Sequence, residues 1–283
     1  MSDAEPWIAV AELPLEIDVS ALSQRLAERD VAHRFDDRAG GRLLLVARRE
    51  DIPTVLMLLR EYSRLLGVPA PSLAVQARQV PVVVAMLLLG LIGALLVSFL
   101  PEAIHGFTFQ DFGVTGAEKL RFEPADTNFS RHEYWRLLTP AFLHFGLFHI
   151  AFNSIWIWEF GRRVEPLAGH GNFLLIFLAI AVGANVGEYL WHPNELFGGL
   201  SGVVYGLLGY IWVRNKLAPH PLLGLTPGIF PLMITWLFVC LAGVVDLFLQ
   251  GGVANGAHVT GLVIGALFGG LAGFSARAQS ATE

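Results

Sequence analysis

"LFGGLSGVVYGLLGY", Leu196 to Tyr210, is the stretch on which the fold and the function depend. It is apolar enough for a lipid bilayer, yet it carries two adjacent glycines near its start, Gly198 and Gly199, and then places Ser201 between Leu200 and Gly202. Small residues allow close approach of helices in membranes. A hydroxyl in this frame therefore raises the question of what approaches it.

The composition indicates an integral membrane protein. Of 283 residues, 54% are hydrophobic and only 15% are charged, whereas soluble domains carry roughly a quarter charged residues. The mean hydropathy is +0.56. The net charge of −5 comes without a basic run, which argues against a nucleic-acid partner. The single cysteine, Cys240, excludes an internal disulfide.

The chain changes character near residue 80. Residues 1–70 contain strand-like and helix-like runs in the order β-α-β-β-α, which predicts a small cytoplasmic α+β domain of ferredoxin-like type. Pro69 and Pro71 discourage a continuous helix, and we interpret residues 71–79 as a linker. From there, stretches near the ~20 residues that a helix needs to cross a bilayer predict an α-helical polytopic membrane protein, a six-helix bundle over residues 80–283. The predicted spans are 80–100, 143–161, 171–190, 201–216, 228–248 and 257–275.

The distribution of basic residues predicts the orientation. Arg and Lys follow the second, fourth and sixth spans, whereas the loops after the third and fifth spans have none. The positive-inside rule then places both termini in the cytoplasm. The first external loop, 101–142, is long and rich in aromatics, and we expect it to lie partly in the membrane interface.

Polar residues gather at one predicted depth. The second span carries His149 and Asn153, which share a helix face, the fourth begins at Ser201, and the sixth begins near His258. Glycines at four-residue spacing in the fourth and sixth spans would bring these helices together. We therefore expect Ser201 Oγ within hydrogen-bonding range of His258, as in a nucleophile and its base.

The start of the fourth span also favours developing negative charge. Unpaired amides and the helix dipole lie at Ser201, and Gly198 and Gly199 permit the tight turn that aims those donors. His149 and Asn153 could add side-chain donors to the same oxyanion.

These motifs together resemble the rhomboid family of intramembrane serine proteases, most closely the bacterial six-span kind with a cytoplasmic N-terminal domain. The resemblance rests on "GLSG", "GAHVTGLVIG", "HFGLFHIAFN" and "EYWR". It implies a Ser201–His258 dyad without an acid, Tyr205 stacked under His258, and a first-loop motif at Trp135 and Arg136, with Arg136 paired to Glu165. It further implies an acyl-enzyme mechanism and cleavage of transmembrane protein substrates in the bacterial inner membrane, at a site that opens to the periplasmic side.

Other interpretations remain open beside this one. A non-catalytic rhomboid relative that binds membrane proteins would be expected to lack the serine or the histidine, and a transporter would carry its polar residues nearer the midplane. His144 lies five residues from His149 and is expected to face elsewhere, so no zinc site and no cofactor is expected. Asp246 is not expected to act as a third triad member.

Overall fold

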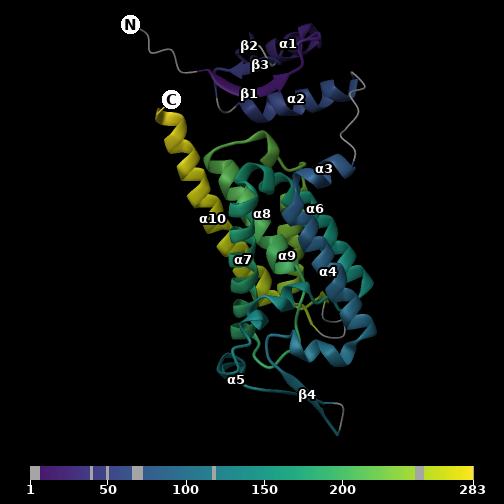
Figure 1. Ribbon diagram of the computed structural model, residues 1–283. Helices are drawn as coiled ribbons and strands as arrows, with labels where there is room; N and C mark the ends of the chain where they lie inside the picture. The colour runs from purple at the N-terminus through teal and green to yellow at the C-terminus, as the bar shows by residue number, and fades with distance from the viewer. Residues whose placement is uncertain are drawn as a thin grey trace. The chain divides into compact units, whose positions relative to one another are not determined.

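A computed structural model describes residues 7–38, 41–48, 51–65, 73–116, 119–245 and 252–282 of the chain. It separates into two compact units, one formed by residues 1–72 together with Pro219–Gly224 and the other by the remaining residues. Figure 1 shows the strands of the first unit and the long helices of the second.

The N-terminal unit has the predicted order of elements. These are β1 (Ile8–Leu13), α1 (Ser20–Ala27), β2 (His33–Arg38), β3 (Gly41–Val46) and α2 (Ile52–Leu65). The three strands form an antiparallel sheet in the order β1-β3-β2. β3 is central and contributes the fully buried Leu44 and Val46 to a core that also contains Leu22 and Leu26 of α1 and Val55 of α2. Within the described residues the sheet has three strands.

The second unit consists mainly of helices. They are α3 (Leu73–Gln79), α4 (Pro81–Phe99), α6 (Leu147–Ala168), α7 (His170–Trp191), α8 (Ser201–Leu217), α9 (Ile229–Leu241) and α10 (Asn255–Thr282). Each predicted span contains a helix, but α9 ends at Leu241, short of the predicted residue 248, and α10 continues past the predicted residue 275 to Thr282. Residues 246–248 of the fifth span lie outside the described residues. Within the predicted linker, residues 73–79 form α3. The helical conformation is interrupted at Val80, and α4 begins at Pro81.

Both ends of the second predicted helix differ from prediction for physical reasons. The second helix begins at Leu147 rather than 143, because Thr139–Phe142 form a 3-10 turn, η4, and the chain stays extended at Leu143. The same helix continues past residue 161 to Ala168, since its last turns remain buried at Val164 and Glu165 and Gly169 ends it.

α8 lies at the centre of the helical unit. Eleven of its seventeen residues are buried, including the whole run from Gly202 to Ile211. Its tightest partner is α10, where a Cβ at Gly269 would lie 2.5 Å from the Tyr210 carbonyl oxygen. Backbones this close tolerate no side chain between them, so the glycine repeats bring the two helix starts together.

Among the described residues, three helices are long and apolar enough to cross a membrane: Pro81–Phe99, His170–Trp191 and Asn255–Gln279. The chain is therefore a multi-pass membrane protein. α9 is a shorter apolar helix of thirteen residues. α8, with seventeen residues, would extend for only about 25 Å at 1.5 Å per residue, which agrees with the short fourth span expected from the sequence.

The connection between α4 and α6 contains several short elements of secondary structure. It contains η2 (Pro101–Gly106), the hairpin of β4 (Phe112–Thr115) and β5 (Lys119–Phe122), α5 (Ala125–Ser130) and η3 (Tyr134–Leu137). Figure 1 shows β4 and α5 beyond the ends of the long helices.

Candidate active site

Ser201 and His258 are in direct contact. Ser201 is the first residue of α8 and His258 lies in the first turn of α10. The Nε2 atom of His258 is 2.8 Å from Ser201 Oγ, and His258 is 5% exposed. The glycine packing explains the contact, because a Cβ on Gly202 would lie 2.7 Å from the Ala184 Cβ and 3.2 Å from the Ala257 carbonyl oxygen.

Among the residues that the structure describes, the second ring nitrogen of His258 has no acid as a hydrogen-bond partner. Its Nδ1 is buried and has no hydrogen-bond partner among the described residues. The ring instead lies against Tyr205, with centroids 4.7 Å apart and planes tilted by 42°. The hydroxyl of Tyr205, on α8, donates a hydrogen bond to the Met233 carbonyl of α9 at 3.2 Å, which fixes the position of the tyrosine ring. Asp246 lies outside the described residues.

The turn before Ser201 is fixed by the backbone of η4. Gly199 has a φ of +113°, a conformation that favours glycine, and its amide donates to the Pro140 carbonyl at 3.0 Å. A Cβ at Gly198 would lie 2.8 Å from the carbonyl oxygens of Pro140 and Leu143. Both glycines therefore shape the turn, and the Gly199 amide is already in use.

His149 and Asn153 approach that turn from α6. A Cβ on Gly199 would lie 2.6 Å from His149 Nε2 and 3.4 Å from Asn153 Nδ2. Asn153 is 3% exposed, and its Nδ2 is buried without a hydrogen-bond partner among the described residues. Leaving a buried donor unpaired costs about 1–3 kcal/mol. An atom that accepts this hydrogen bond, such as an oxyanion beside Ser201, would offset that cost.

The expectation that His144 faces away from His149 is wrong. The two ring centroids are 5.0 Å apart. Residue 144 precedes α6, which begins at Leu147, so helical spacing does not apply to it. His144 is fully buried. Its Nδ1 donates to the Phe142 carbonyl at 2.8 Å, and its Nε2 accepts the Leu200 amide at 3.4 Å. It thereby supports the residue before Ser201, a role that the sequence reasoning missed.

The expected pairing of Arg136 with Glu165 is also wrong. The guanidinium of Arg136 donates to Glu133 Oε2 at 2.6 Å and to the Thr108 carbonyl at 3.1 Å, and Trp135 Nε1 donates to the Gly106 carbonyl at 3.0 Å. These bonds tie the first loop to itself.

Helix length explains why the pair does not form. Arg136 precedes α6, whereas Glu165 lies 18 residues beyond the start of that helix at Leu147, or about 27 Å along it. There Glu165 accepts the amides of Val82 and Val83 at 3.0 and 2.9 Å. The Glu165 carboxylate thus caps the start of α4.

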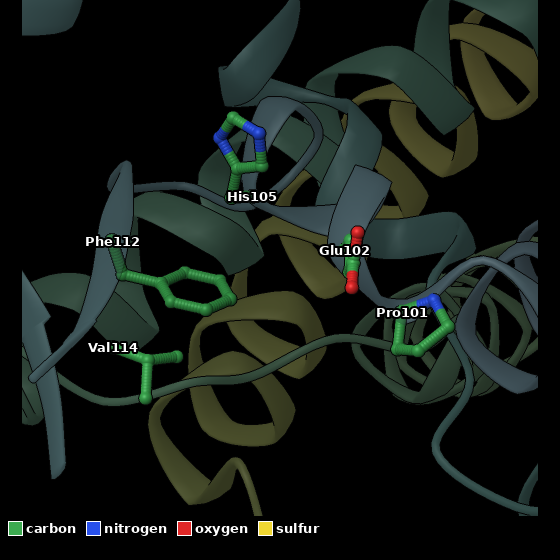
Figure 2. A pocket seen from close by; sticks show the side chains of 5 residues that line it. All are labelled: Pro101, Glu102, His105, Phe112 and Val114. Carbon is green, nitrogen blue, oxygen red and sulfur yellow. The ribbon is translucent and has the colours of Figure 1, made fainter. Parts of the chain in front are cut away.

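The cavity in Figure 2 lies on the first loop. Neither Ser201 nor His258 lines it. It measures about 370 Å³ and is lined by Pro101, Glu102, His105, Phe112 and Val114. Figure 2 shows Phe112 and Val114 coming from the hairpin side and Glu102 and Pro101 from the segment opposite. None of the lining residues belongs to the site predicted from the sequence.

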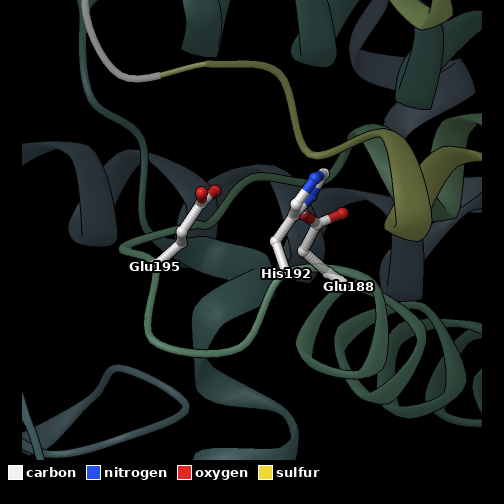
Figure 3. A group of neighbouring side chains, drawn as sticks. All are labelled: Glu188, His192 and Glu195. Atoms are coloured by element: carbon white, nitrogen blue, oxygen red, sulfur yellow. Dashed lines mark hydrogen bonds and ion pairs between the residues drawn. The ribbon is translucent and has the colours of Figure 1, made fainter.

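One group of side chains has the composition of a metal-ligand set. Glu188, His192 and Glu195 place one ligand atom each within 4.8 Å of one another (Figure 3). Both oxygens of Glu188 already have partners, however: Oε2 accepts the Ala257 amide at 2.9 Å, and Oε1 lies 3.4 Å from His192 Nδ1. These contacts assign Glu188 to the packing of α7 on α10.

These features define the class of the protein: a helical multi-pass membrane protein with a serine–histidine pair at the start of two glycine-packed helices. The chain belongs to the rhomboid family. Residues 131–273 match the rhomboid domain, and residues 6–80 match the rhomboid N-terminal domain.

Relatives in two bacteria support the assignment. The chain is 41% identical over 141 residues to the rhomboid protease GlpG of Photorhabdus laumondii, covering 50% of this chain and 48% of that protein. It is 41% identical over 135 residues to the rhomboid protease GlpG of Yersinia pestis, covering 48% and 47%. The match thus spans about half the length of these curated relatives.

Proposed function

We propose that the chain is an intramembrane serine endopeptidase that hydrolyses peptide bonds in or near transmembrane segments of other membrane proteins. The observation that carries the proposal is the 2.8 Å contact between Ser201 Oγ and His258 Nε2 in a chain that belongs to the rhomboid family. The same contact argues against a role confined to binding, since a binding factor has no need of a nucleophile and a base.

Acylation begins with the hydroxyl of Ser201. Its oxygen attacks the scissile carbonyl carbon while its proton passes to His258 Nε2, which gives a tetrahedral intermediate with a negative oxygen. The protonated histidine then donates that proton to the leaving amine, the C–N bond breaks, and an ester with Ser201 remains. Water attacks the ester by the reverse order of proton transfers and releases the acid.

Three groups are available to the negative oxygen. These are the side chains of His149 and Asn153 and the backbone amide of Ser201 at the start of α8. Each preorganised donor of this kind contributes about 2.7–4 kcal/mol to the transition state. The unpaired Nδ2 of Asn153 supports its assignment, and Gly198 and Gly199 contribute by shaping the turn. Tyr205 supplies the orientation of the histidine ring that an acid supplies in triads.

The setting follows from the same reasoning. All six helices from α4 to α10, with α5 excluded, span the bacterial inner membrane, both termini are cytoplasmic, and the site opens to the periplasmic side. Residues 1–70 form the cytoplasmic domain, 71–79 connect it, and 80–283 form the protease domain. The partners are transmembrane protein substrates and the surrounding lipid.

The test is hydrolysis of a single-span substrate in proteoliposomes. Wild type should cleave it, and Ser201→Ala and His258→Ala should each abolish cleavage. Ser98→Ala is the matched control, because Ser98 is a serine in α4 whose hydroxyl donates to the Ala94 carbonyl of its own helix. Cleavage that survives Ser201→Ala would refute the proposal.

A further inference from the structure

Glu188 is a buried carboxylate that the mechanism above does not use. It lies near the end of α7 and is 1% exposed. Its Oε2 accepts the backbone amide of Ala257 at 2.9 Å, and Ala257 directly precedes His258 in the chain. Figure 3 shows Glu188 and His192 side by side, next to the chain that enters α10.

The first turn of α10 depends on this contact. Amides in the first turn of a helix have no partner within the helix, and a negative group there is favoured by the helix dipole. The turn is also pressed against α7, since a Cβ at Gly256 would lie 2.8 Å from the Trp191 Cβ and 3.0 Å from the Glu188 Cα. The carboxylate and this packing together fix the height and rotation of the turn.

We propose that Glu188 is a positioning residue for His258 and acts through the backbone of α10. This inference rests on the proposed function. The Nδ1 of His258 has no partner among the described residues, so Glu188 does not orient the ring as the acid of a triad does. It holds the residue from which the ring projects, and thereby keeps Nε2 within reach of Ser201 Oγ.

A second buried carboxylate in the chain caps a helix in the same way and serves as a control. Glu165, near the end of α6, is fully buried, accepts the amides of Val82 and Val83 in the first turn of α4, and takes a hydrogen bond from His170 Nδ1 at 2.7 Å. Glu165 lies 12 residues beyond Asn153 on α6, or about 18 Å from it along the helix. Its loss should therefore destabilise a helix start without displacing His258.

The test compares Glu188→Ala and Glu188→Gln with Glu165→Ala in the full-length protein. The readouts are kcat and KM on a membrane substrate and the rate at which a fluorophosphonate labels Ser201, each corrected for the folded fraction. Glu188→Ala should lower kcat and the labelling rate by about tenfold to a hundredfold, the cost of misplacing a catalytic group by about 1 Å, with KM unchanged. Glu188→Gln should retain more activity than Glu188→Ala, because its amide oxygen still accepts the Ala257 amide.

A readout independent of activity is amide hydrogen exchange at residues 255–258, which should accelerate in Glu188→Ala and remain slow in Glu165→Ala. The inference is overturned if folded Glu188→Ala labels at the wild-type rate, if Glu165→Ala loses as much kcat, or if KM alone changes. Those results would leave the proposed function intact, whereas failure of the wild type to label at Ser201 would overturn the function and this inference with it.

Discussion

Asn153 provides the sharpest separation between catalysis and stability. Its Nδ2 is buried with no hydrogen-bond partner among the described residues, and it faces the turn that precedes Ser201, near Gly199. Replacement by alanine therefore removes a donor that the resting protein does not use. The change should weaken the transition state and leave the folded state nearly as stable as before.

The expected changes in kcat and in the free energy of unfolding both follow from the contacts of Asn153. Loss of one oxyanion donor lowers kcat by about 10²–10³-fold, or about 2.7–4 kcal/mol. In the resting state the unpaired amide costs about 1–3 kcal/mol, and its removal offsets the packing that the smaller alanine loses. We expect the free energy of unfolding of Asn153→Ala to stay within about 1 kcal/mol of wild type.

Asn185 supplies the control for this prediction. It is equally buried, but its Nδ2 donates to the Leu137 carbonyl at 2.8 Å. Asn185→Ala leaves that carbonyl unpaired, which should lower the free energy of unfolding by about 1–3 kcal/mol with kcat of the folded protein retained. Thermal unfolding in detergent and single-substrate kinetics measure both quantities. Asn153→Ala with wild-type kcat, or with a loss that follows unfolding, would refute the reasoning.

Three further outcomes are expected. Gly199→Ala should add about 1–3 kcal/mol of strain and abolish cleavage, because Gly199 has a φ of +113° and the new Cβ would lie 2.6 Å from His149 Nε2. Thermal unfolding and kinetics measure the two effects, and an active, stable variant would contradict this. Arg136→Leu should lower stability by about 3 kcal/mol and expose the first loop to proteases, whereas an unchanged digestion pattern would contradict the hydrogen bonds assigned to it. The hydrogen bond from Arg42 lowers the pKa of Asp37, so the N-terminal domain should lose stability as pH falls below about 4. Hydrogen exchange of β2 and β3 should show this loss in wild type and a smaller loss in Asp37→Asn.

The features that the sequence could predict are those with a local period. Apolar runs long enough to cross a bilayer located the helices, and glycines four residues apart at Gly261 and Gly265 predicted the approach of α10 to α8. The Ser201–His258 contact followed from that approach, because each residue lies in the first turn of its helix. Strand-like and helix-like runs likewise gave the order of elements in the N-terminal unit.

The features that were missed depend on chain segments far apart in sequence. His144 lies outside α6, so its contact with the Leu200 amide has no periodic signal. Arg136 and Glu165 were paired by resemblance, but α6 separates them and each finds partners at its own end. The acceptance of the Ala257 amide by Glu188 joins residues 69 positions apart. Acidic residues near the ends of apolar spans, such as Glu165 and Glu188, are the sequence signal that could have indicated such caps.

Mass spectrometry of the fluorophosphonate-treated protein in membranes tests the central claim most directly. The claim is that the histidine at the start of α10 activates the serine at the start of α8. One phosphonyl group per chain should appear on Ser201 in wild type and in Ser98→Ala, and none should appear in His258→Ala. Labelling at another residue, or full labelling of Ser201 without His258, would contradict the account.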